Sequence, residues 1–155
     1  TQVIVDISSR FLFESEVFAR RQGRELSSDE LCSIMTESQL ATYGDGLDSS
    51  ALHPYMWAVK PHYYSSVFYN FPYMFGLLFA LGVYARYREA PAGFVSKYEA
   101  LLSSTGMNDA LTLAVGFGID LAQPDFWEAS LALVVADINR FEQLVAEKTA
   151  ALSQR

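Results

Sequence analysis

The residues best suited to chemistry lie between positions 53 and 87. This window holds both histidines of the chain, His53 and His62, and more than half of its aromatic residues. No carboxylate occurs between positions 48 and 89, so the window alone cannot form a paired-carboxylate acid/base site or an oxygen-rich cation site. It can supply hydrogen-bond donors, because tyrosine hydroxyls, a histidine and Lys60 in apolar surroundings are groups that stabilise an oxyanion.

The same residues also fit a purely structural interpretation. Aromatic side chains at helical spacing usually belong to a protein core, and an isolated histidine is more often a hydrogen-bonded structural residue than a catalyst. His53 directly precedes Pro54 and is expected to be a structural turn residue. A lysine such as Lys60 most often extends its ammonium group into solvent.

Composition and charge exclude several classes of protein. The 155 residues are 51% hydrophobic and 19% charged, which is too apolar for a disordered tail. The net charge of -7 argues against nucleic acid and anionic lipid as partners. The single cysteine, Cys32, excludes an internal disulfide framework and a thiolate zinc site, and it predicts a reducing, cytoplasmic setting. No signal peptide is recognisable at the start.

The elements that must position these residues are predicted to be helices, so the expected fold class is all-α. Ser27 and Glu30 have the spacing of a capping box. We expect one helical segment over 1–155, and the absence of a helix start signal before Val3 suggests a piece of something longer. The helices are expected at about 3–22, 27–43, beyond Pro61 to 87, 93–103, 108–116 and 124–152.

Pro72 leaves two arrangements open for the tyrosines beside it. Tyr69 and Tyr73 are four residues apart, so one helix containing both would place them on one face. Proline favours the first turn of a helix, however, so the helix could begin near Phe71 with Tyr69 in the preceding loop. Either arrangement can place both hydroxyls at the wall of a cleft.

The stretch from Val67 to Ala85 is long enough to be considered as a membrane span. Pro72 lies near its start, Gly76 and Gly82 interrupt it, and its tyrosines are spread along its length instead of forming two interfacial belts. A helix buried on all sides inside a larger soluble protein explains the same composition, and we expect no membrane partner.

Several segments of the chain resemble a known enzyme family. The segments from His53 to Tyr64 (HPYMWAVKPHYY) and from Phe68 to Tyr73 (FYNFPY) resemble the C-terminal part of oligoendopeptidase F, which belongs with thimet oligopeptidase among the zinc metallopeptidases. The resemblance extends over most of the chain and includes residues 4–14, 43–47, 118–120 and 126–127.

This resemblance implies the C-terminal helical part of a larger, mostly helical zincin-type peptidase that hydrolyses short peptides. In that family an HExxH helix and a later glutamate bind zinc, and neither is recognised in this sequence. Zinc is therefore expected in the complete enzyme with no ligand from this chain, and Glu14 and Glu16 are not assigned as ligands. The segment alone is expected to be inactive and to self-associate.

The residue roles that the resemblance implies concern substrate and oxyanion. By motif position, His62, Tyr69 and Tyr73 correspond to the residues that bind the substrate backbone and donate hydrogen bonds to the oxyanion. Tyr63 and Tyr64 share substrate binding. Lys60 is a candidate contact for a substrate carboxylate.

Two other functional classes are compatible with the same residues. A non-enzymatic helical module would bind peptides or a partner protein through the aromatic window. A membrane-associated hairpin built on 67–85 is the third. For the leading hypothesis the expected partners are short peptides and the rest of the peptidase chain.

Overall fold

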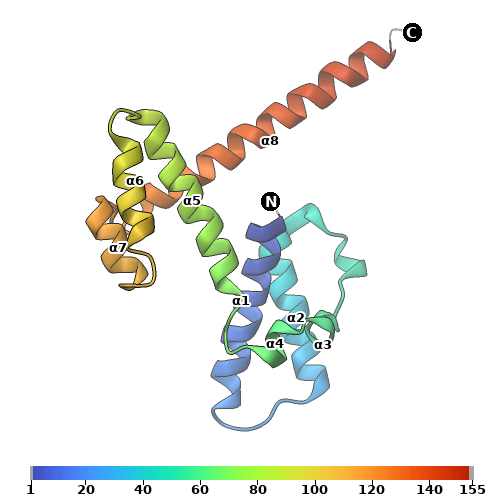
Figure 1. Ribbon diagram of the computed structural model, residues 1–155. Coiled ribbons are helices and arrows are strands. Elements are labelled where there is room, and N and C mark those ends of the chain that lie inside the picture. Colours follow the sequence, from blue (N-terminus) through green and yellow to red (C-terminus); the bar gives the residue numbers. More distant parts are fainter. Residues whose placement is uncertain (1, 154–155) are drawn as a thin grey trace. The chain divides into compact units, whose positions relative to one another are not determined.

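The computed structural model describes residues 2–153, which form helices joined by turns, with no β-strand among them (Figure 1). The predicted all-α class is confirmed. The α-helices are α1 (Gln2–Arg21), α2 (Ser28–Tyr43), α3 (Met56–Val59), α4 (His62–Ser65), α5 (Phe71–Glu89), α6 (Phe94–Ser103), α7 (Ala110–Phe117) and α8 (Pro124–Ser153), and two 3₁₀ turns, η1 (Gly44–Gly46) and η2 (Ser49–Ala51), follow α2.

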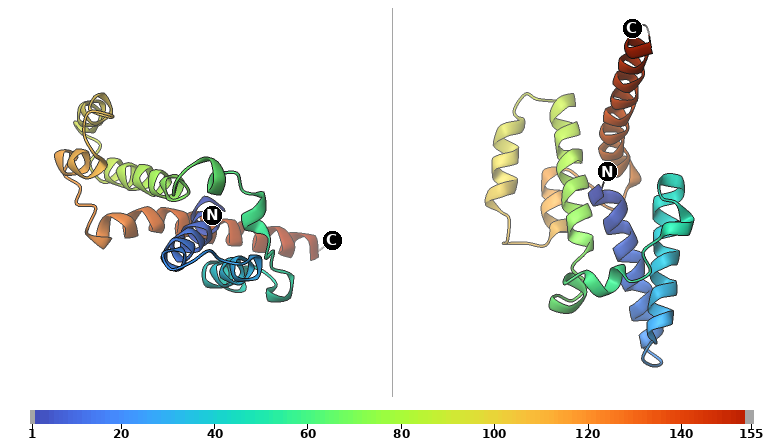
Figure 2. Two further views of the ribbon diagram at one scale, coloured as in Figure 1. Left: turned by 90° about the horizontal axis from the view of Figure 1, so that it is seen from below. Right: turned by 90° about the vertical axis from the view of Figure 1, so that its right-hand side faces the viewer.

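The chain divides into two compact units. The first unit ends at Leu77 and the second begins at Leu78, so the boundary lies inside α5. In the first unit α1 and α2 form an antiparallel hairpin, and they lie side by side in all three views (Figures 1 and 2). Its core is built on Phe13 from α1 and on Ile34 and Met35 from α2.

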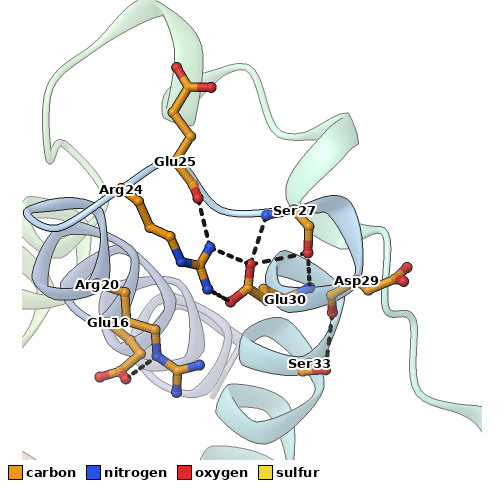
Figure 3. A network of polar contacts seen from close by, with 8 residues as sticks. All are labelled: Glu16, Arg20, Arg24, Glu25, Ser27, Asp29, Glu30 and Ser33. Atoms are coloured by element: carbon orange, nitrogen blue, oxygen red, sulfur yellow. Dashed lines mark hydrogen bonds and ion pairs between the residues drawn. The ribbon is translucent and has the colours of Figure 1, made fainter.

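The capping box predicted at the start of α2 is present (Figure 3). The Ser27 hydroxyl accepts the Glu30 N–H at 3.3 Å, and the Glu30 carboxylate accepts the Ser27 N–H at 2.9 Å. The guanidinium of Arg24 donates to the same carboxylate from two nitrogens, at 2.9 and 2.5 Å. These hydrogen bonds lower the pKa of Glu30 to about 2. The turn between α1 and α2 is therefore specified by polar contacts within a few residues.

The second unit is held mainly by apolar packing. Val83, Ala114, Ile119 and Phe126 form its buried core. Gly82 on α5 lies against α8 so closely that a Cβ atom there would stand 2.4 Å from Cζ of Phe126. The absence of a side chain at this position therefore allows α5 and α8 to approach each other.

The ends of α7 follow its sequence signals. The Asp109 carboxylate accepts the Thr112 N–H at 2.9 Å, which caps the start of the helix. At the other end, Gly118 has a φ of 86°, a left-handed conformation that glycine adopts without steric cost.

Helix α5 is not buried on all sides within this chain. Gly82, Val83 and Ala85 are its buried residues, whereas Phe71, Tyr84 and others remain partly exposed. No described helix has the length and hydrophobicity needed to span a bilayer. The second half of α8 is likewise exposed from Val135 onward over its described residues.

Candidate functional site

The residues predicted to do chemistry lie in the first unit, at the end of α3, on α4, in the loop that leads into α5 and in the first turn of α5. Pro61 opens α4, and its carbonyl accepts the backbone N–H of Tyr64 and of Ser65, both at 2.9 Å. Residues 66–70 form a loop, and α5 begins at Phe71 with Pro72 in its first turn. Of the two arrangements that the sequence left open, the structure has Tyr69 in the approach loop.

His62, Tyr69 and Tyr73 come together at this point. His62 Nε2 and Tyr73 Oη are 3.0 Å apart, and the two rings meet edge to face with centroids 5.6 Å apart. The Tyr69 ring stands perpendicular to that of Tyr73 at a centroid distance of 5.8 Å. Tyr69 and Tyr73 are 49% and 45% exposed, so this edge of the unit presents aromatic rings with polar groups to solvent.

The other predicted substrate-binding residues are placed differently. The Tyr63 ring packs on Phe13 at a centroid distance of 5.0 Å, and burial raises the pKa of its hydroxyl. The Tyr64 hydroxyl donates to the carbonyl oxygen of Trp57 at 3.1 Å. Lys60 is half-buried at the end of α3, and no ion pair involving it is found among residues 2–153. None of these side chains contacts the His62–Tyr73 pair through a described interaction.

A hollow in the surface of about 310 Å³ lies beside α3 and α4. Its wall is mostly apolar and aromatic, which suits an apolar side chain, and Arg21 and Glu25 are the charged residues among those that line it. Trp57 Nε1 and Tyr63 Oη, on two of its lining residues, are buried without a hydrogen-bond partner among the described residues. The lining residues include Phe13, Val17, Leu26, Trp57, Tyr63 and Tyr64.

The sequence did not predict the part that Glu14 and Asn70 play beside this site. Glu14 on α1 is 5% exposed and Asn70 is fully buried, and Asn70 Nδ2 donates to Glu14 Oε2 at 2.7 Å. Burial raises the pKa of Glu14, while the hydrogen bonds from Asn70 and the nearby His62 act in the opposite direction. The available signal was Asn70 itself, a strongly polar residue in a long apolar stretch directly before the helix.

His53 has a different environment from His62. The Gln39 side chain donates to the His53 carbonyl at 3.0 Å and accepts the His53 N–H at 3.2 Å. Both contacts involve the backbone of His53, and Gln39 is 5% exposed. This histidine therefore lies in a turn that α2 holds in place, as the sequence predicted.

The residues present do not fit a zinc site. Among residues 2–153 there is no cluster of three or more histidine, cysteine, aspartate or glutamate side chains able to hold a metal ion. Glu14 is occupied by Asn70, and Glu16 forms an ion pair with Arg20 on the same helix face at 2.6 Å. No chemical step is therefore assigned to a metal in this chain.

Comparison of the chain with protein-family models, with curated proteins and with solved structures found no match.

Proposed function

We propose that this chain is the C-terminal portion of a zinc metalloendopeptidase that hydrolyses short peptides. Its part would be to bind the peptide backbone and to stabilise the oxyanion that forms when the peptide bond is attacked. The observation that carries the proposal is the hydrogen-bonded contact between His62 and Tyr73, with Tyr69 packed on the same tyrosine. The sequence resemblance to oligoendopeptidase F supplies the reaction class.

The hydrogen-bonding capacity of tyrosine determines which tautomer the proposal requires. A tyrosine hydroxyl has one proton to donate, so if Tyr73 donated it to His62 none would remain for an oxyanion. In the productive arrangement His62 is protonated on Nε2 and donates to Tyr73 Oη, which leaves the Tyr73 O–H free to point toward substrate. A donation from His62 also polarises the hydroxyl and strengthens its own hydrogen bond.

Tyr69 would supply a second hydroxyl to the same peptide. It is half exposed and lies in the loop before α5, where it can accept or donate without disturbing a helix. Donors fixed in advance stabilise a developing negative charge more than they stabilise the neutral carbonyl, and this difference lowers the barrier. Zinc and its ligands would come from residues other than those described, and the metal would supply the activated water.

Tyr73→Phe in the complete enzyme tests the proposal. Removing one oxyanion donor should lower kcat by about 100- to 1000-fold, with a smaller change in KM. Tyr98→Phe on α6 is the matched control, since it removes the hydroxyl of a tyrosine that is similarly exposed, at 40%. A kcat within a few fold of wild type for Tyr73→Phe would exclude Tyr73 from the mechanism.

A second function, peptide binding without turnover, is favoured by the aromatic hollow and by the lack of a metal cluster in the described residues. Calorimetric titration of the 155-residue chain with short peptides, with and without zinc, separates the two functions. Zinc-independent binding by a full-length protein that never hydrolyses its ligand would favour the binding module. Zinc-dependent hydrolysis by the complete enzyme, together with an inactive isolated chain, would favour the peptidase.

A further inference from the structure

The residues directly before and after Tyr69 both contact α1. The Phe68 ring packs against Phe11 and Phe18 of α1, at centroid distances of 5.5 and 5.6 Å. Asn70 is bound to Glu14 through its side chain, whose Nδ2 donates to Glu14 Oε2 at 2.7 Å. The loop that presents Tyr69 is therefore held by an apolar contact on one side and by a buried polar contact on the other.

The polar contact also governs the start of α5. The Asn70 carbonyl accepts the Tyr73 N–H at 3.4 Å, which closes the first turn of the helix. A displacement of Asn70 would therefore move the backbone of Tyr73 relative to α4, which carries His62. Because the Tyr73 hydroxyl must stay near 3.0 Å from His62 Nε2, a shift of about 1 Å would weaken or break that hydrogen bond.

A carboxylate suits this position for a chemical reason. An ionised carboxylate only accepts hydrogen bonds, and the one that it accepts from the Asn70 amide is strengthened by the negative charge. Glu14 and Asn70 are 56 residues apart in the chain and both are buried. A buried carboxylate is unfavourable unless it is hydrogen-bonded, so the bond from Asn70 stabilises Glu14 in this position.

We propose that Glu14 is a positioning residue that fixes Asn70 and, through Asn70, the loop and first helical turn that carry Tyr69 and Tyr73. The effect of this positioning on catalysis rests on the function proposed above. The effect of Glu14 on the His62–Tyr73 contact does not rest on that function. Glu14 touches neither substrate nor the reacting atoms in this proposal.

The chain offers a matched control. Gln39 is also 5% exposed, and it binds the backbone of His53 instead of the loop before α5. Because the chain has only two histidines, NMR spectra of histidine labelled with ¹³C and ¹⁵N give one set of ring signals for each. Glu14→Ala should change the His62 signals and leave those of His53 in place, and Gln39→Ala should do the reverse.

The second measurement is peptide hydrolysis by the complete enzyme at a temperature where each variant is fully folded. Glu14→Ala should lower kcat by about 100-fold, the cost of a misplacement of roughly 1 Å. Gln39→Ala should leave kcat within a few fold of wild type, even if it lowers the melting temperature as much as Glu14→Ala does. Glu14→Gln, which keeps the size and one acceptor oxygen, should recover most of the loss.

The outcomes distinguish the two proposals. A folded Glu14→Ala chain with unchanged His62 signals, or with both histidines shifted equally, would overturn the positioning role. If the His62 signals move as expected but the complete enzyme shows no peptidase activity, the positioning role stands and the proposed function fails. Should Glu14→Ala not fold, Asn70→Ala tests the same contact from its other side and is expected to give the same change at His62.

Discussion

The two units of the chain are stabilised by different kinds of contact. In the first unit, side-chain hydrogen bonds join residues far apart in the sequence, including Glu14 with Asn70 and Tyr43 with Asp6. In the second unit the described side-chain hydrogen bonds span no more than six residues, the widest being that from Trp127 Nε1 to the Leu121 carbonyl at 2.9 Å. Packing around Phe126 and Ile119 supplies its tertiary contacts instead.

This difference relates structure to proposed function. Apolar packing is non-directional, so it can stabilise a unit without fixing any one side chain. Hydrogen bonds between buried polar groups depend on distance and angle, so they define the positions of the segments that they join. The candidate site lies in the unit that contains such bonds, as expected if its geometry has to be maintained.

The largest loss of stability is expected from Gly82→Ala in the second unit. The added Cβ would lie 2.4 Å from Cζ of Phe126 and 2.7 Å from Oγ of Ser130, both on buried residues. Overpacking of this kind should reduce the free energy of unfolding by up to about 3 kcal/mol. Hydrogen exchange should show faster opening of α8, while α1 and α2 stay protected.

Gly76→Ala is the control on the same helix. Apart from its chain neighbours and the adjacent backbone of α5, no atom lies within 4 Å of the Cβ position at Gly76. The better helix propensity of alanine should therefore raise stability by about 0.5 to 1 kcal/mol. Equal losses from the two variants would show that α5 tolerates no side chain at either glycine and would remove packing at Gly82 as the cause.

A smaller loss is expected from Gln39→Ala in the first unit. The variant leaves the N–H and carbonyl of His53 without their buried partner, which should cost about 2 kcal/mol. Urea unfolding followed by hydrogen exchange at the amides of α1 and α2 measures the change in the first unit. A loss below about 0.5 kcal/mol would mean that water replaces the amide, and the proposed contrast between the units would be weaker.

Ser27→Ala should have a more modest effect, because the capping box is local and exposed. Loss of an N-cap hydroxyl typically costs about 1 kcal/mol. Ser28→Ala, one residue further on, is the control, and the melting temperatures of the two variants in thermal unfolding are compared. If Ser28→Ala costs as much as Ser27→Ala, the cap is not the source of the stability.

The smallest changes are expected from pH acting on two carboxyl groups, of which Glu14 is the first. Burial raises the pKa of this carboxyl above its ordinary value of 4.5, so the folded state holds the proton more tightly than the unfolded state. Stability from this group is full below pH 4.5 and falls as pH rises through the folded pKa. Glu14→Gln lacks this dependence, so its stability relative to wild type should increase across that interval in chemical denaturation at a series of pH values.

Glu30 should respond in the opposite sense. Its pKa is lowered to about 2 by Arg24 and Ser27, so the stability that it contributes is present above pH 4.5 and is lost as pH falls toward 2. A Glu30→Gln variant that kept the wild-type acid dependence would contradict this assignment.

Local signals made most of the helix boundaries predictable. The Ser27–Glu30 capping box encodes the start of α2 within a few residues, and the structure has it as expected. The expected end of the helix near residue 116 is also close to the observed end of α7 at Phe117. Pro72 could not decide between two helix starts, because proline is compatible with a first turn but does not by itself exclude a turn before it.

The candidate site was only partly predictable. His62 and Tyr73 are 11 residues apart with a break between α4 and α5, so no helical period relates them, and they were grouped through the family resemblance. Glu14 with Asn70 and Gln39 with His53 are tertiary pairs, 56 and 14 residues apart. Such pairs leave no periodic pattern, because chain folding alone decides which buried polar groups meet.

Phe68 has a backbone φ of 49°, in the left-handed region that bulky residues rarely adopt. Glycine at position 68 would relieve the backbone strain but would remove the ring that contacts Phe11, Phe18 and Phe71. A β-branched residue would lose the ring and increase the strain. The backbone at position 68 therefore favours glycine while the packing favours an aromatic ring, and neither of these substitutions improves both.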